Sequence, residues 1–228
     1  MIFHLRSQLT AEFLGTAFLL MAAVGSGIMG ERLAAGNIAV ALLANSLATG
    51  SALVALILAL GPISGAHFNP VVTLGCAMRG AMEWRQVPAY MLAQVIGAFC
   101  GVAGAHLMFG MPLFFSSHHA RSGGAALWSE FVATFGLLLI ILGCVRSRSS
   151  AVAFAVGAYI AAAYWFTAST AFANPAVTMA RAASDTFAGI RPVDAPAFIV
   201  AQFAGAVAGT LCFRWLAGAQ LGPAPASK

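Results

Sequence analysis

Long runs of apolar residues dominate the chain, and they predict helices that cross a membrane. Residues 7–30 contain one charged residue, Glu12, and predict the first helix. Residues 33–78 contain no Lys, Arg, Asp or Glu, which is too long for one span of about 20 residues and awkward for two. We therefore expect one helix over about 38–60, a break at Gly61-Pro62, and a half-span after the break.

The later apolar runs continue this pattern. Residues 86–109, 126–145 and 196–216 each predict one spanning helix, and only Glu130 interrupts the second of them. Residues 149–180 are uncharged and long enough for one span plus half of another. A transmembrane β-barrel would need alternating segments of about ten residues, and these runs do not alternate. We expect an all-α membrane protein with six transmembrane helices and two re-entrant half-helices.

Each half-span begins with a similar tripeptide. Asn69-Pro70-Val71 and Asn174-Pro175-Ala176 each end a long apolar stretch and precede a segment that allows two or three helical turns. Asn is a favoured N-cap, and Pro is favoured at the first helical position. A helix start has free N–H groups and about half a positive charge. Because both tripeptides lie in uncharged segments, they predict two helix starts inside the membrane.

Three sequence markers recur in the same order in the two halves of the chain, which indicates an internal duplication. Glu12-Phe-Leu-Gly-Thr16 matches Glu130-Phe-Val-Ala-Thr134, Asn69 to Thr73 matches Asn174 to Thr178, and Ala93 to Ala98 matches Ala201 to Ala206. Each half has three full spans, an odd number, so the second copy must enter the membrane inverted. The two half-helices then come from opposite faces and meet at the midplane.

The duplication divides the chain into four parts. These are a first repeat over 1–110, a connecting loop over 111–125, a second, inverted repeat over 126–217, and a tail over 218–228 that we expect to be disordered. Basic residues favour the cytoplasmic side of a membrane protein. With the N-terminus inside, that side has more of them, so both termini are expected to be cytoplasmic. The cytoplasmic set is Arg6, Arg79, Arg85, Arg146, Arg148, Arg214 and Lys228, against Arg32, Arg121, Arg181 and Arg191 outside.

The composition agrees with a membrane protein. Hydrophobic residues make up 61% of the chain and charged residues 7%, against about 25% charged in a soluble domain. The mean hydropathy is +0.91. The net charge of +5 comes from scattered basic residues, with no cluster suited to nucleic acid. We expect no nucleic-acid partner, no cofactor, and no cleavable signal peptide.

The sequence SGAHFNP at 64–70, the second Asn-Pro-Ala box and the paired Glu-x-x-(Gly/Ala)-Thr segments resemble the major intrinsic proteins, that is, aquaporins and aquaglyceroporins. The resemblance covers about residues 8–216. It implies a homotetramer in membrane lipid with one pore per subunit, and asparagine amides that point into the pore. It also implies that Glu12 and Glu130 accept hydrogen bonds from the re-entrant loops. Further pore-lining residues expected from it are Gly65, Ala66, His67, Thr170 and Phe172.

The resemblance also implies a selectivity filter at four positions counted from the asparagines, namely Thr49, Ala162, Ala171 and Val177. Water-specific members have an aromatic residue, a His, a small residue and an Arg there, whereas glycerol channels have two aromatics and the Arg. All four residues are small in this chain. Arg181 follows Val177 by four residues and is expected near the mouth. We therefore expect a wide, arginine-less filter.

Within the family this filter resembles the AqpS-type channels of bacterial arsenic-resistance operons. That resemblance implies a location in the bacterial inner (plasma) membrane. It also implies passage of water, glycerol-sized solutes, arsenite as neutral As(OH)3, and methylated arsenicals. The alternatives are a water-specific aquaporin, an ion-coupled secondary transporter, and a structural protein with a vestigial pore. A coupled transporter needs ionisable residues near the midplane, and only the two glutamates qualify.

Other candidate chemistry has simpler interpretations. Cys76, Cys100, Cys144 and Cys212 lack metal-ligand spacing and are expected to pack as small hydrophobes. His118-His119 has no nearby carboxylate or further Cys or His in the sequence, so a solvated loop is favoured over a metal site. Ser64 with His67 lacks an oriented third group, which argues against a hydrolase. The chain is not expected to be an enzyme.

Overall fold

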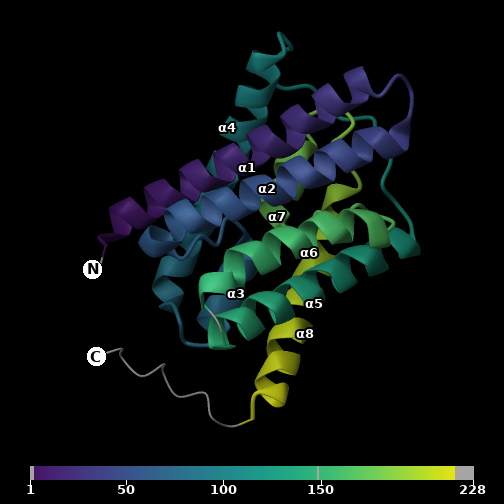
Figure 1. Ribbon diagram of the computed structural model, residues 1–228. Coiled ribbons are helices and arrows are strands. Elements are labelled where there is room, and N and C mark those ends of the chain that lie inside the picture. Colours follow the sequence, from purple (N-terminus) through teal and green to yellow (C-terminus); the bar gives the residue numbers. More distant parts are fainter. Residues whose placement is uncertain (1–2, 148, 219–228) are drawn as a thin grey trace.

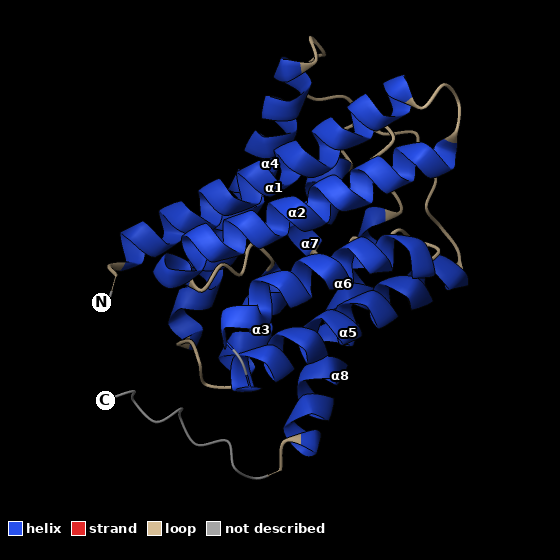
Figure 2. Cartoon of the chain, viewed as in Figure 1, coloured by secondary structure: helices blue, strands red, loops and turns tan. Residues whose placement is uncertain are grey.

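The structure, a computed structural model, describes residues 3–147 and 149–218, and the regular elements of these residues are helices (Figures 1 and 2). The expected all-α fold is therefore confirmed. The predicted tail lies outside the described residues from position 219 onward. The long helices are α1 (Leu5–Leu33), α2 (Ile38–Ser64), α4 (Val87–Met108), α5 (Gly124–Ser147), α6 (Val152–Phe166) and α8 (Ala195–Leu216). The half-helices are α3 (Pro70–Met78) and α7 (Pro175–Arg181), and short 3-10 turns cover Trp84–Gln86 and Ser149–Ala151.

Five of the long helices are long and apolar enough to cross a membrane on their own. The sixth, α6, has 15 residues because its first turn is the 3-10 turn Ser149–Ala151. The segment after α6 turns back into the molecule at once and leads to α7. The sequence-based division of 149–180 into one span and one half-span thus matches the helices.

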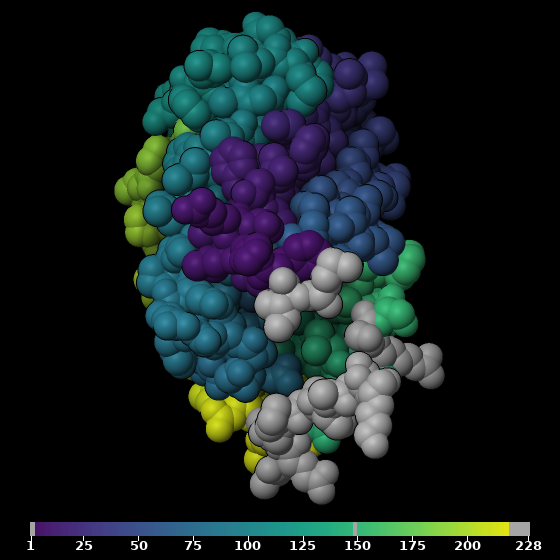
Figure 3. All heavy atoms as spheres, turned by 90° about the vertical axis from the view of Figure 1, so that its left-hand side faces the viewer, coloured from purple at the N-terminus to yellow at the C-terminus, as the bar shows by residue number. Residues whose placement is uncertain are grey.

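The two halves pack in the same way. Helix α1 lies between α2 and α4 (Figures 1 and 3). Helix α5 lies between α6 and α8 (Figure 1). Contact between α2 and α6 joins the halves. Each half-helix packs against the last helix of both halves, so α3 contacts α8 and α4, and α7 contacts α4 and α8. This exchange brings the starts of α3 and α7 together in the interior.

Glycines permit the closest helix contacts, as their small-xxx-small spacing predicts. A Cβ added at Gly97 of α4 would lie 2.3 Å from the carbonyl oxygen of Phe13 in α1. A Cβ added at Gly205 of α8 would lie 2.3 Å from the carbonyl oxygen of Phe131 in α5. Only a hydrogen atom fits at either position. The α1–α4 pair and the α5–α8 pair therefore pack equally closely at these glycines.

The predicted helix break at Gly61-Pro62 is wrong. Helix α2 continues through Pro62 and ends at Ser64, where Gly65 takes a left-handed φ of +87° and its N–H donates to the Gly61 carbonyl. A proline in the last turn removes one backbone hydrogen bond but does not stop the few residues after it. The glycine with positive φ, and not the proline, ends the helix.

Candidate functional site

Both half-helices begin at the predicted asparagines. The side-chain oxygen of Asn69 accepts a hydrogen bond from the N–H of Val71 at 3.1 Å. The side-chain oxygen of Asn174 accepts from Ala176 at 3.0 Å and from Val177 at 3.3 Å. A proline follows each asparagine at the first helical position. The local chemistry of Asn-Pro thus starts a helix at both places, as predicted.

The same asparagines tie the two halves to each other. The Nδ2 of Asn69 donates to the carbonyl oxygen of Ala173, and the Nδ2 of Asn174 donates to that of Phe68, both at 2.8 Å. A side-chain amide has two N–H groups, so one on each asparagine remains for another acceptor. The starts of α3 and α7, each with a partial positive charge, therefore meet in the interior.

The loops that enter the half-helices have an unusual backbone. Ala66 and Phe68, three and one residues before the first asparagine, have φ values of +50° and +49°. Ala171 and Ala173, at the same distances from the second, have +48° and +47°. Residues with a side chain pay on the order of 1–3 kcal/mol for a sparsely populated conformation. Other groups must hold both loops in place.

Glu12 of α1 is buried and holds the first loop. Its Oε1 accepts hydrogen bonds from the Ser64 hydroxyl at 2.7 Å and the His67 N–H at 2.9 Å. Its Oε2 accepts from the Phe68 N–H at 2.7 Å and the Gln94 amide at 2.8 Å. Hydrogen bonds to a carboxylate are about twice as strong as neutral ones, so they offset the backbone cost.

Glu130 of α5 holds the second loop in the same way. Its Oε1 accepts from the Phe172 N–H at 2.9 Å, and its Oε2 accepts from the Ala173 N–H at 2.8 Å and the Gln202 amide at 2.6 Å. The amide of each glutamine also donates to a threonine hydroxyl on a half-helix. The network of Glu12 therefore connects α1, the first loop, α3 and α4. The network of Glu130 connects α5, the second loop, α7 and α8.

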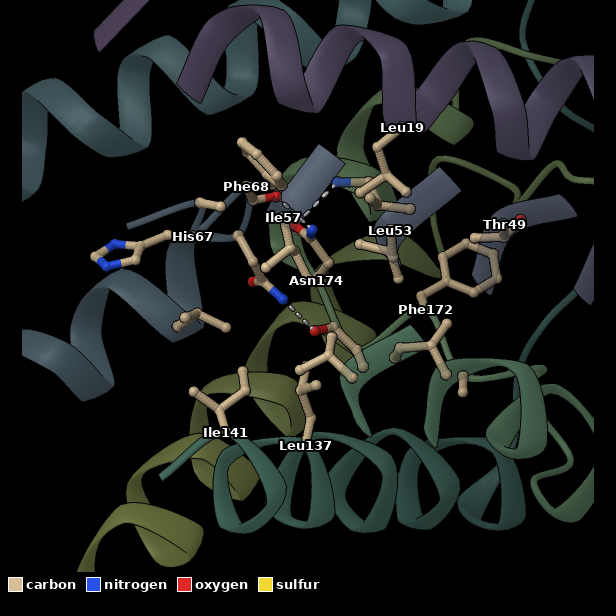
Figure 4. A pocket seen from close by; sticks show the side chains of 18 of the residues that line it. Leu19, Thr49, Leu53, Ile57, His67, Phe68, Leu137, Ile141, Phe172 and Asn174 are labelled. Carbon is tan, nitrogen blue, oxygen red and sulfur yellow. Dashed lines mark hydrogen bonds between the residues drawn. The ribbon is translucent and has the colours of Figure 1, made fainter. Parts of the chain in front are cut away.

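A cavity of about 280 Å³ passes the two asparagines. Figure 4 shows His67 at one end, Thr49 and Phe172 at the other, and Asn174 between them. We call these the His67 end and the Phe172 end. The wall between the ends is largely apolar and includes Leu19, Ala23, Leu53, Ile57, Val72, Leu137, Ile141, Val156 and Ile160. Such a wall offers no hydrogen bonds, so the asparagines and loops provide the polar groups at mid-cavity.

Three of the four predicted filter residues line this cavity, and one does not. Thr49, Ala171 and Val177 are lining residues. Ala162 is exposed, and Tyr164 lines the cavity in its place, with its hydroxyl 3.3 Å from the Thr49 hydroxyl. The cavity-facing residues of α6 are four apart, and Ala162 lies two residues from that row. The prediction for Ala162 is wrong, because the cavity-lining residues of α6 are Val152, Val156, Ile160 and Tyr164.

The four predicted filter positions contain no arginine, but Arg181 of α7, which was expected near the mouth, also lines the cavity. Arg181 is 2% exposed and lines the cavity near the Phe172 end, not at an open mouth. Its guanidinium carbon lies 3.5 Å from the centroid of the Phe172 ring, and its Nε donates to the Ala188 carbonyl. Arg181 follows Val177 by four residues, about one helical turn, so both side chains lie on one face of α7.

Comparison with known proteins agrees with this geometry. The model of the major intrinsic protein family matches residues 3–151 and 143–224. The chain belongs to this family. It is 52% identical over 214 residues to "Aquaglyceroporin AqpS" of Rhizobium meliloti (strain 1021), covering 94% of this chain and 91% of the relative. It is 34% identical to "Aquaporin NIP1-4" of Oryza sativa subsp. japonica, covering 93% of this chain and 78% of the relative.

The fold is also that of a solved family member. The X-ray structure of the aquaglyceroporin from Plasmodium falciparum superposes with a TM-score of 0.72 at 23% sequence identity. The match covers 91% of this chain and 93% of the other. At this identity the likeness supports the aquaporin fold, with its inverted repeat and two re-entrant half-helices.

The remaining predicted pore residues of this major intrinsic protein divide into two groups. Gly65, Ala66, His67 and Phe172 line the cavity. Thr170 instead accepts a hydrogen bond from Arg121 at 3.3 Å. The other members of the two boxes are buried and do not line the cavity. They are Pro70, Val71, Pro175 and Ala176.

Two cavity residues were missed by the filter prediction based on family positions. Cys76 and Arg181 each follow a box asparagine by seven residues, and both line the cavity. Val72 and Val177, at plus three, line it as well. Because positions three and seven share one face of a helix, helical spacing alone could have identified the pair.

The two histidines of the connecting loop have separate contacts, since His118 contacts Asp185 and the His119 N–H donates to the Ser117 hydroxyl at 3.2 Å. The N–H of His118 donates to Oδ1 of Asp185 at 2.8 Å, and the His118 ring lies 2.8 Å from Oδ2. These hydrogen bonds, the backbone one first, lower the pKa of Asp185 below its ordinary value. Within 3–147 and 149–218, no cluster of three His, Cys, Asp or Glu suits a metal ion. All four cysteines are free thiols.

Proposed function

We propose that this major intrinsic protein is a passive channel for water and small neutral hydroxylated solutes, with one pore in each chain. The observation behind the proposal is the cavity itself, which has apolar walls and two asparagine-capped helix starts at its centre. The positive ends of two helices attract the oxygen of a passing molecule and disfavour a cation. The apolar wall binds nothing strongly, so a neutral molecule can leave as readily as it enters.

The side chains at the Phe172 end favour the passage of solutes larger than water. Tyr164, Phe172, Arg181 and Thr49 gather there, which places two aromatic rings, one cation and one hydroxyl at the cavity wall. Aromatic faces suit the carbon side of a polyol, while the hydroxyl and the guanidinium suit its oxygens. Glycerol, neutral As(OH)3 and methylated arsenicals are the solutes we propose. The likeness to a relative named an aquaglyceroporin supports the same class.

The competing functions fit the geometry less well. A proton-coupled transporter would need an exchangeable carboxylate at the midplane. All four oxygens of Glu12 and Glu130 already accept hydrogen bonds from the loops and neighbouring helices. Both carboxylates therefore serve as structural supports. A water-specific channel remains the second candidate. Tyr164 and Arg181 line the Phe172 end, and both are bulkier than the four small residues of the predicted filter.

We propose a homotetramer in the plasma membrane of a bacterium, with both termini cytoplasmic. The His67 end then faces the cytoplasm and the Phe172 end faces outward. The distribution of basic residues along the chain supports this orientation.

Stopped-flow light scattering on proteoliposomes tests the channel. One preparation is compared for water, glycerol, urea and arsenite against empty liposomes. Leu137→Trp should occlude the cavity and lower every flux at least about tenfold, since Leu137 lines its wall. Leu92→Trp is the matched control, because Leu92 is 61% exposed on α4, and it should conduct like the wild type. Wild-type fluxes equal to those of empty liposomes would refute the proposed function.

A further inference from the structure

Arg121 lies in the connection between the two repeats and binds the loops on both sides of α7. Its Nε donates to the carbonyl oxygen of Gly189 at 2.7 Å, and its Nη2 donates to that of Phe187 at 3.3 Å, both after α7. Its Nη1 donates to the Ser169 carbonyl at 3.2 Å and to the Thr170 hydroxyl at 3.3 Å, both before α7. Arg121 itself does not line the cavity. One side chain outside the cavity thus joins the two segments that flank the half-helix.

The backbone next to these contacts is strained at Thr170. This residue has a φ of +61°, which a β-branched residue rarely adopts. The equivalent residue of the first repeat, four positions before Asn69, is Gly65, which takes its φ of +87° without a steric cost. The second loop therefore needs a contact that keeps Thr170 in this conformation. Arg121 provides it, because it binds the hydroxyl of Thr170 and the carbonyl just before it.

The internal repeat also shows which group Arg121 replaces. In the first repeat the carbonyl of Ser64 accepts a hydrogen bond from the hydroxyl of Tyr90 in α4, at 3.1 Å. The equivalent residues of the second repeat are Ser169 and Phe198, and a phenylalanine has no hydroxyl to donate. Arg121 binds the Ser169 carbonyl instead. The connecting loop thus supplies to the second repeat a donor that the first repeat obtains from its own helix.

The second loop also has less support from its carboxylate. Glu12 accepts hydrogen bonds from the Ser64 hydroxyl, two loop N–H groups and a glutamine. Glu130 accepts from two loop N–H groups and a glutamine. Within the described residues, the equivalent Ser169 hydroxyl makes no hydrogen bond to Glu130. With one hydrogen bond fewer from its glutamate, the second loop depends more on Arg121.

A displacement of this loop would reach the cavity wall through the next two residues. Ala171 and Phe172 directly follow Thr170, and both line the cavity. The guanidinium carbon of Arg121 also lies 5.1 Å from the centroid of the Phe172 ring, within the range of a cation–π contact. The position of Phe172 in the wall therefore depends on a residue that does not touch the solute.

We propose that Arg121 is a positioning residue of the channel. By holding the loop before α7 in its strained conformation, it sets the shape of the Phe172 end and, through it, the ratio of glycerol flux to water flux. Glycerol fills more of a pore than water does, so a displaced wall obstructs glycerol more. This inference rests on the proposed channel function.

Stopped-flow fluxes of glycerol and water across proteoliposomes test the proposal. Arg121→Met keeps an unbranched side chain but removes its donors and its charge, and it should lower the ratio of glycerol to water flux at least about threefold. Arg32→Met is the matched control. The Arg32 guanidinium carbon lies 5.0 Å from the centroid of the Phe109 ring, but Arg32 is exposed, and this variant should keep the wild-type ratio.

Two second-site changes distinguish positioning from a general loss of folded protein, which lowers both fluxes together and leaves their ratio unchanged. Thr170→Gly removes the steric cost of the positive φ. Phe198→Tyr adds the hydroxyl that Tyr90 provides in the first repeat. Each change, added to Arg121→Met, should raise the ratio again to within about twofold of the wild type. If neither raises the ratio above that of Arg121→Met, the proposal is wrong.

The remaining outcomes separate this proposal from the channel function. An unchanged or higher ratio in Arg121→Met, or an equal fall in Arg32→Met, would overturn the role of Arg121 alone. A wild type that conducts neither water nor glycerol would overturn the channel function instead. If Arg121→Met does not fold, Arg121→Lys is measured. Its single nitrogen cannot reach the carbonyls on both sides of α7 at once, so the ratio must fall there too, and a wild-type ratio would refute the proposal.

Discussion

Replacing Gly205 by alanine should weaken the packing of α8 on α5. The added Cβ would lie 2.3 Å from the Phe131 carbonyl oxygen, whereas ordinary contacts begin near 3.4 Å. The two helices must therefore separate by about 1 Å, because the obstructing atom is backbone and cannot rotate away. Overpacking of this kind costs about 1–3 kcal/mol, and the gain in helix propensity from Gly to Ala returns at most about 1 kcal/mol. We expect a net loss of about 1–2 kcal/mol.

A matched control separates packing from propensity. Gly143 of α5 is also helical, but a Cβ there would first meet the Phe213 ring at 3.9 Å. Gly143→Ala should therefore stabilise the protein by about 0.5–1 kcal/mol through the lower conformational freedom of the unfolded chain. The repeat supplies a second test, since Gly97→Ala meets the Phe13 carbonyl at the same 2.3 Å and should behave like Gly205→Ala.

Thermal melting of the detergent-solubilised protein measures these differences, and glycerol flux reports their effect on the pore. Separation of α8 from α5 also moves Gln202 away from Glu130, so flux should fall along with the melting temperature. The reasoning fails if Gly205→Ala melts at or above the wild-type temperature. It also fails if Gly143→Ala is destabilised to the same extent, because then any added methyl group would explain the result.

Two further predictions concern the buried Glu130 and the loop residue Asp185. In Glu130→Gln the new NH2 group must point at the N–H of Phe172 or of Ala173, which should lower the stability by about 3 kcal/mol and reduce flux. An unchanged melting temperature would contradict the support role of Glu130. Asp185→Asn should lower the melting temperature slightly at pH 6. Since the folded pKa of Asp185 is depressed, that difference should be present above about pH 3.8 and disappear as the pH falls through the folded pKa; an equal difference at pH 3 would refute it.

The sequence by itself determined the two helix starts and their equivalence. An N-cap asparagine followed by proline acts within one turn of helix, so it has the same effect whatever surrounds it. The matched markers indicate a duplication. Because each half has three spans, an odd number, the second half must be inverted in the membrane. The positions of Glu12 and Glu130 in these markers also indicated their role, because a buried carboxylate requires several donors and each one lies beside a re-entrant loop.

The tertiary structure alone decided which side chains face the pore. The predicted filter relied on fixed distances from Asn69 and Asn174, whereas the structure has Tyr164 and not Ala162 on the cavity wall. Likewise Arg181 lies on the cavity wall because α7 presents two successive turns to the pore, and Phe172 and the Ala188 carbonyl hold it there. Local signals fix where a helix starts, but its rotation depends on contacts with distant segments, and in this chain that rotation places the charge in the pore.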